Sequence, residues 1–166
     1  MVDRSEIPPD AFLAPNHDHK ACIHEGLLAA QRICDRASVR LTSDRQQVLE
    51  VLLHDHAALG AYDIIDRMDW GARKRASSVV YRALEFLIGH GLVHKLHSRN
   101  AFIACAHPEV DHGTQFLICA GCQIIAEIGD RKLDQSLNQA ARKAGFTLHR
   151  PMIEIEGLCP YCAAIK

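Results

Sequence analysis

Residues 77–105 read SSVVYRALEFLIGHGLVHKLHSRNAFIAC and combine one helical pattern with two strand-like runs. Apolar residues recur at helical spacing from Val80 to Ile88, and Gly91 is positioned to end the helix. The runs 92–96 and 101–105 follow, separated by the turn residues Ser-Arg-Asn. This stretch therefore predicts a helix followed directly by a β-hairpin.

Three more helices are expected upstream of this stretch. The first has its apolar side chains between Leu27 and Ala37, the second follows Thr42, which can cap it, and the short third spans about Ala61 to Met68. Helices followed by a hairpin indicate a winged helix-turn-helix, in which the last helix before the hairpin lies in the major groove of DNA. A small helical domain with a solvated charged face is the alternative.

The charge distribution supports DNA binding only weakly. The chain has a formal net charge of −1, and residues 32–100 carry eleven basic and eight acidic side chains, a balance of +3. An excess of this size does not by itself establish a polyanion-binding surface. Ser77 is the expected N-cap of the last helix. The candidate DNA-facing residues precede and open that helix: Arg73, Lys74, Arg75, Ser77, Ser78, Tyr81 and Arg82.

Two CxxC pairs lie in the C-terminal part of the chain, Cys119–Cys122 and Cys159–Cys162. Two such pairs supply the four soft ligands that a tetrahedral zinc ion binds at about 2.3 Å. Folded structure must bring the second pair back to the first, because 36 residues separate them. Two disulfides or a redox CxxC are the alternatives. The odd total of seven cysteines and the matched spacing favour a closed structural zinc site.

The residues around these pairs predict a compact α/β unit. Strand-like runs occupy 116–119 and 124–128. Asp130 is expected to cap a helix that Gly145 ends, and a final strand is expected over 146–155.

A second group of ligand-type residues surrounds the join between the two parts: His94, Cys105, His112 and Glu127. A thiolate together with imidazoles favours zinc over metals that take harder ligands. Because the ligands come from both sides of the join, a metal bound there would favour one arrangement of the two parts, as a metal switch requires. The alternative is chance, since the chain contains eleven histidines.

The N-terminal tail carries a further ligand-rich patch without a recognised spacing: His17, His19, Cys22 and His24. It is a candidate for transient metal binding or for no function. Cys34 lies on an apolar helical face and is expected to be a small core residue.

Several motifs together resemble the ferric uptake regulator family of bacterial metal-dependent repressors, and in particular its zinc-uptake-regulator branch. They cover about residues 25 to 162 and comprise Leu41-Thr42, Gln46-Gln47-Val48-Leu49, Ala61-Tyr62-Asp63, Val80-Tyr81-Arg82-Ala83-Leu84, Gly91-Leu92-Val93-His94-Lys95 and the two CxxC pairs. The resemblance implies that His94, Cys105, His112 and Glu127 form a sensing site. It also implies a homodimer, base contacts from Tyr62 and Arg82, and a place for Tyr81 at the DNA surface.

One segment departs from the family pattern. The region before the first CxxC pair is rich in histidines in iron-sensing members but sparse here, over residues 107–112. This argues against a third metal site and against iron. We therefore expect about two Zn²⁺ ions per chain, one structural and one regulatory.

The expected organisation is α+β: an N-terminal winged helix-turn-helix domain and a C-terminal α/β dimerisation domain with a four-cysteine zinc site. The boundaries predicted are a tail at 1–21, the DNA-binding domain at 22–103, a hinge at 104–112 and the dimerisation domain at 113–166. No apolar run approaches the roughly 20 residues that span a membrane, and no signal-peptide pattern opens the chain. A cytoplasmic protein with no membrane partner is expected.

These features predict a zinc-responsive repressor of zinc-uptake genes that binds double-stranded operator DNA as a zinc-loaded homodimer. Its ligand would be the metal ion, with no other small molecule. A sensor of another metal or of peroxide is the rival within the family. A zinc hydrolase or deaminase is disfavoured, because the P-C-x-x-C part of the deaminase signature is absent and Glu127 would fill the position that an enzyme leaves to water. Zinc storage would leave the winged helix unexplained.

Overall fold

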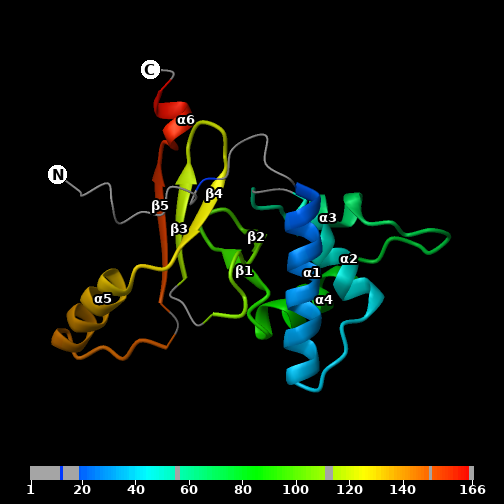
Figure 1. Cartoon of the computed structure of the whole chain (residues 1–166), viewed down its shortest axis with the longest axis horizontal. Coiled ribbons are helices and arrows are strands. Elements are labelled where there is room, and N and C mark those ends of the chain that lie inside the picture. The colour runs from blue at the N-terminus through cyan, green and yellow to red at the C-terminus, as the bar shows by residue number, and fades with distance from the viewer. Residues whose placement is uncertain (1–11, 13–18, 55–56, 111–113, 150, 165–166) are drawn as a thin grey trace. The chain divides into compact units, whose positions relative to one another are not determined.

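A computed structural model describes residues 12, 19–54, 57–110, 114–149 and 151–164. The chain divides into two compact units, which we call the N-terminal unit (residues 16–110) and the C-terminal unit, which includes residues 111–166 (Figure 1). No helix in the described part is long and apolar enough to cross a membrane.

The N-terminal unit contains four helices and a two-stranded wing (Figure 1). Its elements are α1 (His19–Arg36), α2 (Ser43–Leu53), α3 (Ala61–Arg67), α4 (Ser77–Gly89), β1 (Val93–Leu96) and β2 (Ala101–Ala104). The strands pair antiparallel, with Val93 opposite Ala104 and Leu96 opposite Ala101. The predicted winged helix-turn-helix is confirmed.

A single core holds this unit together. Leu52 of α2, Ile64 of α3 and Leu87 of α4 are fully buried within it. The wing is attached to the segment between α2 and α3 through Phe102, whose backbone N–H and C=O exchange hydrogen bonds with Leu59 at 2.8 and 2.9 Å. Cys34 is also part of the core, as predicted, and burial raises the pKa of its thiol.

Helix boundaries in this unit differ from prediction at two places. Ser77 is the first residue of α4 and Ala76 occupies its N-cap position, so the predicted Ser77 cap is wrong. Helix α1 begins at His19, earlier than its apolar face suggested. Thr42 does occupy the N-cap position of α2, although its side chain makes no capping hydrogen bond. Gly91 was predicted to end α4, and its φ of +70° is the left-handed conformation typical of such a residue.

The described residues of the C-terminal unit form a three-stranded sheet and two helices. Its elements are β3 (Thr114–Cys119), β4 (Ile125–Ile128), α5 (Arg131–Lys143), β5 (Met152–Gly157) and α6 (Pro160–Ala163). The strand order is β4-β3-β5, with β4 antiparallel and β5 parallel to the central β3. The two units together confirm the predicted α+β class.

The last strand is shorter than predicted at its start. Residues 146–155 look strand-like in sequence, but β5 begins only at Met152, which pairs with Thr114, the first residue of β3. Before it, Gly145 ends α5 at φ +70° and the N–H of Phe146 bonds back to the Ala141 carbonyl at 2.8 Å. The first residue of the predicted strand therefore belongs to the turn that ends α5.

Helix α5 is held to the sheet by polar bonds at its N-terminus. Asp130 caps it as predicted, accepting from the N–H groups of Lys132 and Leu133 at 2.7 and 3.2 Å. The buried Gln115 of β3 donates to the Asp130 carbonyl (3.0 Å) and the Asp134 carboxylate (2.7 Å) and accepts from the Asp130 N–H. No residue of α5 is buried.

Candidate metal centres and nucleic-acid interface

The two CxxC pairs meet in the C-terminal unit. The sulfur atoms of Cys119, Cys122, Cys159 and Cys162 all lie within 4.8 Å of one another. Parallel pairing of β3 with β5 brings them together, because it places Cys119 opposite Gly157, two residues before the second pair. All seven cysteines of the chain are free thiols, so neither CxxC pair forms the disulfide that the sequence left open.

Local backbone geometry shapes each pair around this cluster. Cys119 ends β3, and Cys159 is the N-cap of α6, where its sulfur accepts from the Cys162 N–H at 3.4 Å. The Cys159 N–H in turn donates to the Cys119 sulfur at 3.3 Å. A Cβ at Gly121 would come within 2.9 Å of the Cys162 sulfur, so this position has no room for a side chain.

The distances match what a tetrahedral zinc ion requires. Two thiolates bound to such an ion at 2.3 Å lie roughly 3.8 Å apart. The sulfur atoms of Cys122 and Cys159, from different pairs, are 3.7 Å apart. The N–H groups that point at sulfur are the supporting contacts that metal-bound thiolates commonly receive. The donor set and its spacing therefore fit zinc.

Electrostatics in the cluster also fit a cation-binding role. The backbone N–H of Cys159, followed by that of Cys122, lowers the pKa of Cys119 to about 6. Hydrogen bonds with the side chain of Cys122, and then with those of Cys119 and Cys159, raise the pKa of Cys162 to about 12. The Cys119 thiolate forms readily, while the raised pKa values of Cys122 and Cys162 oppose ionisation of those thiols. A divalent cation at the centre removes this conflict, because it stabilises all the thiolates together.

The second predicted ligand group is divided between the units. His94 of β1 and Cys105, just after β2, lie in the wing with a ring nitrogen and the sulfur within 4.8 Å. Antiparallel pairing sets this proximity: His94 lies opposite Ile103, and the Cys105 N–H bonds to the Leu92 carbonyl at 3.0 Å. Cys105 is buried and His94 half-buried. The wing thus presents a nitrogen and a sulfur ligand side by side.

The other two predicted ligands belong to the C-terminal unit. Glu127 is a half-buried residue of β4, opposite Phe116 of β3. His112 lies outside the described residues. Each remains a predicted ligand.

The predicted tail patch is described only in part. His17 lies outside the described residues, as does the side chain of His19. Cys22 is half-buried and His24 exposed, both on α1. Among the described residues, neither belongs to a group of three or more metal-type ligands.

The predicted DNA-facing residues lie on the exposed side of α3 and α4. Tyr62 is 77% exposed and Tyr81 50% exposed, unusual values for aromatic side chains in a well-packed unit. Ser77 and Ser78 are found at the start of α4, where Ser78 is exposed. The Arg82 side chain bonds to the Ser78 carbonyl at 3.2 Å and so lies back along the helix toward its N-terminus. The arrangement offers two aromatic rings, two hydroxyls and a guanidinium along these two helices.

Two of the three basic residues before α4 form ion pairs with acidic residues of other helices. Arg73 bonds to Asp44 of α2 at 2.8 Å, and Arg75 bonds to Asp66 of α3 at 2.5 Å. Within the part of the chain that is described, no ion pair involves Lys74. Neither aspartate was predicted from sequence, because partners 29 and 9 positions away leave no periodic signal.

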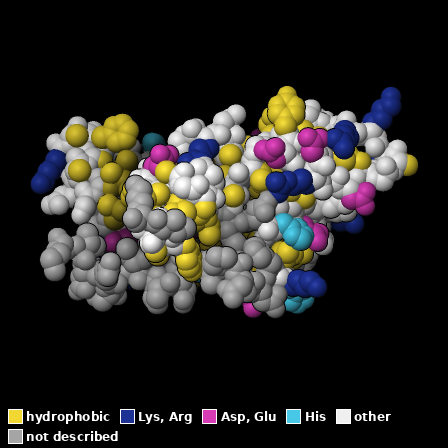
Figure 2. Space-filling view, turned by 90° about the horizontal axis from the view of Figure 1, so that it is seen from above, with side chains coloured by type: hydrophobic (Ala, Val, Ile, Leu, Met, Phe, Trp, Pro, Cys, Tyr) yellow, Lys and Arg dark blue, Asp and Glu magenta, His cyan; other side chains and the backbone are white. Residues whose placement is uncertain are grey.

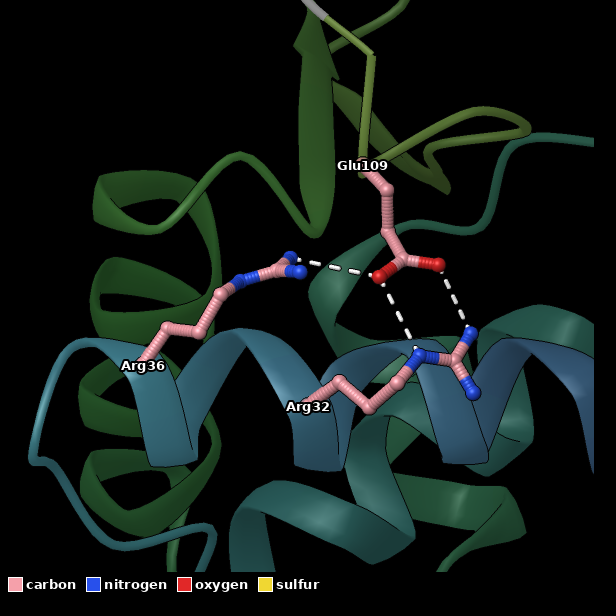
Figure 3. Close-up of polar contacts among 3 residues, drawn as sticks. All are labelled: Arg32, Arg36 and Glu109. Carbon is pink, nitrogen blue, oxygen red and sulfur yellow. Dashed lines mark hydrogen bonds and ion pairs between the residues drawn. The ribbon is translucent and has the colours of Figure 1, made fainter.

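A second ion-pair cluster was also missed. Glu109, in the segment after the wing, accepts two bonds from Arg32 of α1 (3.1 and 2.7 Å) and one from Arg36 (3.2 Å) (Figure 3). We call this group the Glu109 clamp. The Arg32 hydrogen bond lowers the pKa of Glu109 below its ordinary 4.5. The clamp holds the end of the N-terminal unit against α1, three residues before His112.

Comparison with known proteins agrees with this architecture. Residues 36–156 match the ferric uptake regulator family. The zinc uptake regulation protein of Escherichia coli K12 is 32% identical over 148 residues, which cover 89% of this chain and 86% of that protein. A solved zinc uptake regulator complexed with zinc and DNA is similar with a TM-score of 0.80 at 33% identity, covering 86% of this chain and 96% of that one. The holo form of a protein called XcZur has a TM-score of 0.75 at 38% identity, covering 84% and 98%. The chain therefore belongs to the ferric uptake regulator family.

Proposed function

We propose that this protein is a zinc-responsive transcriptional repressor that binds operator DNA as a zinc-loaded homodimer and represses genes for zinc uptake. The observation that carries the proposal is the pairing of His94 with Cys105 within the wing of a winged helix. The wing, which directly follows the helix proposed to contact DNA, thereby carries two metal-type ligands. The similarity to a regulator solved with both zinc and DNA supports the same function.

The four-cysteine cluster is proposed to hold a structural zinc ion. It supplies four sulfur ligands and so leaves no open position for water or substrate. Its zinc would contribute to folding, because the unfolded chain lacks a preformed site. This closed ligand set supports a structural role and gives no support to a redox or hydrolytic one.

The regulatory zinc is proposed to bind His94, Cys105, His112 and Glu127. The wing supplies the nitrogen and sulfur ligands, and the C-terminal unit supplies the remaining two. A metal that needs ligands from both units binds tightly only when the units are suitably arranged, so it shifts the protein toward that arrangement. The shift equals the difference in zinc affinity between the two arrangements. Together with the structural ion, this gives about two zinc ions per chain.

DNA recognition is proposed to use the exposed side of α3 and α4. Arg82 and Tyr62 would contact base edges, with Tyr81, Ser77 and Ser78 at the DNA surface. The exposure of both tyrosines supports this assignment. The basic run Arg73-Lys74-Arg75 was also predicted to face DNA, and in it Arg73 and Arg75 are ion-paired with Asp44 and Asp66.

The C-terminal unit is proposed to form the dimer. Its exposed large apolar side chains are Phe146, Ile155, Leu158 and Tyr161. A second copy of the unit would cover such surface, and a two-fold dimer would place two α4 helices on two half-sites about one or more helical turns apart. A protein that acts on DNA in this way works in the cytoplasm and is a regulator, not an enzyme.

A sensor of another metal or of peroxide is the alternative within the family. The buried Cys105 argues against it, since a thiolate beside an imidazole suits zinc better than manganese or ferrous iron. The test is a DNA-binding titration against free zinc, with manganese and ferrous iron as controls. Zinc-dependent binding at lower free metal than either control requires supports the proposal. Binding that follows manganese or iron, or that needs no metal, contradicts it.

A further inference from the structure

The loop between α3 and α4 is built around a buried tryptophan. Trp70 donates its ring N–H to the Ile65 carbonyl at 2.8 Å and accepts the N–H of Arg73 on its own carbonyl at 2.9 Å. Gly71, at φ +50°, donates its N–H to the Asp69 carboxylate at 2.9 Å. These hydrogen bonds fix the position of the loop from which the basic run Arg73-Lys74-Arg75 starts.

Two of the three basic residues tie this loop to the helices beside it. Arg73 reaches Asp44 in the first turn of α2, with its guanidinium also 5.8 Å from the centre of the Trp70 ring. Arg75 reaches Asp66 near the end of α3. The two arginines thus extend to different helices from positions two residues apart. Lys74 stands between them and, in the described ranges, pairs with neither aspartate.

Helix α4 depends on this loop for the orientation of its first turn. Ala76 occupies the N-cap position and supplies no side-chain capping bond. Three of the proposed DNA-facing residues, Ser77, Ser78 and Tyr81, lie within the first five positions of the helix. A small rotation of this end would move all three. The ion pairs at Arg73 and Arg75 are polar side-chain contacts that hold the residues immediately before it.

The charges of these residues also indicate that the two arginines and Lys74 have different roles. An arginine paired with a carboxylate presents little net positive charge, and a phosphate that approached it would also approach the aspartate. Lys74 is exposed and takes part in neither ion pair, so its positive charge is not offset by these aspartates. Because all four ion-pair partners are partly exposed, the pairs add little to folding stability and can act mainly on orientation.

We propose that Arg73 and Arg75 are positioning residues that fix the start of α4 through Asp44 and Asp66, and that Lys74 is the phosphate contact of this run. The inference rests on the proposed function, because it assigns roles within the DNA-binding surface. It divides three adjacent basic residues into one that sets affinity for any DNA and two that set sequence preference.

The experiment compares two duplexes, one selected from a random pool by the zinc-loaded protein and one of mixed random sequence. Lys74→Ala should weaken binding to both by the same factor and reduce the salt slope by about one. Arg73→Ala should lower the ratio of selected to random affinity by roughly two- to fivefold, the range for an exposed ion pair, and leave the salt slope unchanged. Arg75→Ala should behave like Arg73→Ala.

The deciding variant is Asp44→Asn, which keeps Arg73 but removes its partner. If Arg73 positions α4, Asp44→Asn lowers the ratio of selected to random affinity as Arg73→Ala does. The double variant Asp44→Arg with Arg73→Asp, which rebuilds the pair in reverse, restores the ratio. If Arg73 instead contacts phosphate, Asp44→Asn strengthens binding to both duplexes equally while Arg73→Ala weakens both, and the inference is overturned. Asp66→Asn and Arg75→Ala test the second pair in the same way.

Two controls keep the outcomes separate. Thermal unfolding of each variant should match the wild type within a few degrees, which shows that the helices still fold. Failure of the wild-type protein to bind any selected duplex in a zinc-dependent manner would contradict the proposed function. Zinc-dependent wild-type binding with an unchanged affinity ratio in all four single arginine and aspartate variants would contradict only the positioning roles.

Discussion

The two units of this protein differ in how completely they bury their own apolar residues. The N-terminal unit encloses one core in which side chains from all four helices and the wing are inaccessible. In the C-terminal unit, α5 has no buried residue, and Ile155 of β5 is 43% exposed. Figure 2 shows hydrophobic side chains at the surface, and in the described part of the C-terminal unit the large exposed ones are Phe146, Ile155, Leu158 and Tyr161.

The difference shows that the elements of the N-terminal unit share one core, whereas in the C-terminal unit α5 adds nothing to the core and leaves apolar surface beside it uncovered. The N-terminal unit is stabilised mainly by packing. The C-terminal unit has polar anchors at Gln115 and a cysteine cluster, and its exposed apolar surface is available to a partner. Changes in the second unit should therefore act through metal and dimerisation. Changes in the first should act locally.

The largest effect is expected from Cys122→Ser. Binding of a structural zinc ion contributes roughly 10–16 kcal/mol in small metal-stabilised domains, more than a domain of this kind can lose. The C-terminal unit should unfold, giving a monomeric or insoluble protein without the structural zinc. Metal analysis, sedimentation and limited proteolysis measure the three consequences.

The matched control is Cys22→Ser, which changes a half-buried cysteine of α1 outside the cluster and should leave folding and the structural zinc unchanged. A stable, dimeric Cys122→Ser protein without structural zinc would remove the basis for the structural assignment.

Ile155→Asp should weaken the dimer without unfolding either unit. Burial of an isoleucine side chain is worth about 1.5–3 kcal/mol, so the dissociation constant should rise roughly 10- to 100-fold. Sedimentation equilibrium measures it. Val110→Asp is the control, because Val110 is 63% exposed but lies in the N-terminal unit. Equal dimer affinity in both variants would show that the exposed apolar surface of the C-terminal unit has another use.

Cys105→Ser should uncouple the two units. It should leave a folded dimer with about one zinc ion per chain instead of about two, and its operator affinity should stay low at any attainable zinc level. Coupling between metal and DNA typically amounts to about 1–3 kcal/mol and must be reciprocal, so operator DNA should tighten zinc binding in the wild type by the same factor. Calorimetric titration of zinc with and without DNA measures this. Full zinc-dependent repression by Cys105→Ser would place the sensor elsewhere, with the tail ligands the next candidates.

Arg82→Ala tests the proposed DNA-contacting surface of the N-terminal unit. Loss of a base-edge contact should cost about 1–3 kcal/mol and relax the preference at one operator position. Competition binding with single-base variants of the operator measures both. Arg40→Ala, an exposed arginine before α2, is the comparison and should change neither. Uniform weakening on all sequences by Arg82→Ala would make Arg82 a phosphate contact.

Glu109→Gln should have the smallest effect, confined to the segment after the wing. Loss of the Glu109 clamp should speed hydrogen exchange in residues 105–110 and leave the core of the N-terminal unit unchanged. The wild-type clamp is present at neutral pH, because the pKa of Glu109 is lowered. Its contribution is lost only as the pH falls through that lowered pKa, below 4.5. Unchanged exchange at neutral pH would show that other contacts hold this segment.

Local signals predicted the elements that depend on neighbouring residues. The apolar spacing of α4, the Asp130 cap, the Gly145 helix end and both CxxC pairs were read correctly from sequence. Each is governed by contacts within a few positions, so the chain carries the signal continuously. Ser77 was misassigned because serine is favoured at an N-cap, whereas the ion-paired loop starts the helix one residue earlier.

The sequence by itself determined the winged helix, the donor types and the resemblance to a family of metal-dependent repressors. Only the tertiary structure decided which donors meet and which charges are already paired. The parallel pairing of β3 with β5 brings the second cysteine pair to the first, and residues 29 or 77 positions apart form the ion pairs of Arg73 and Glu109. The start of β5 at Met152 likewise depends on where β3 begins. Contacts between distant segments leave no periodic pattern in either segment, because each partner by itself is compatible with many others until the backbone brings them together.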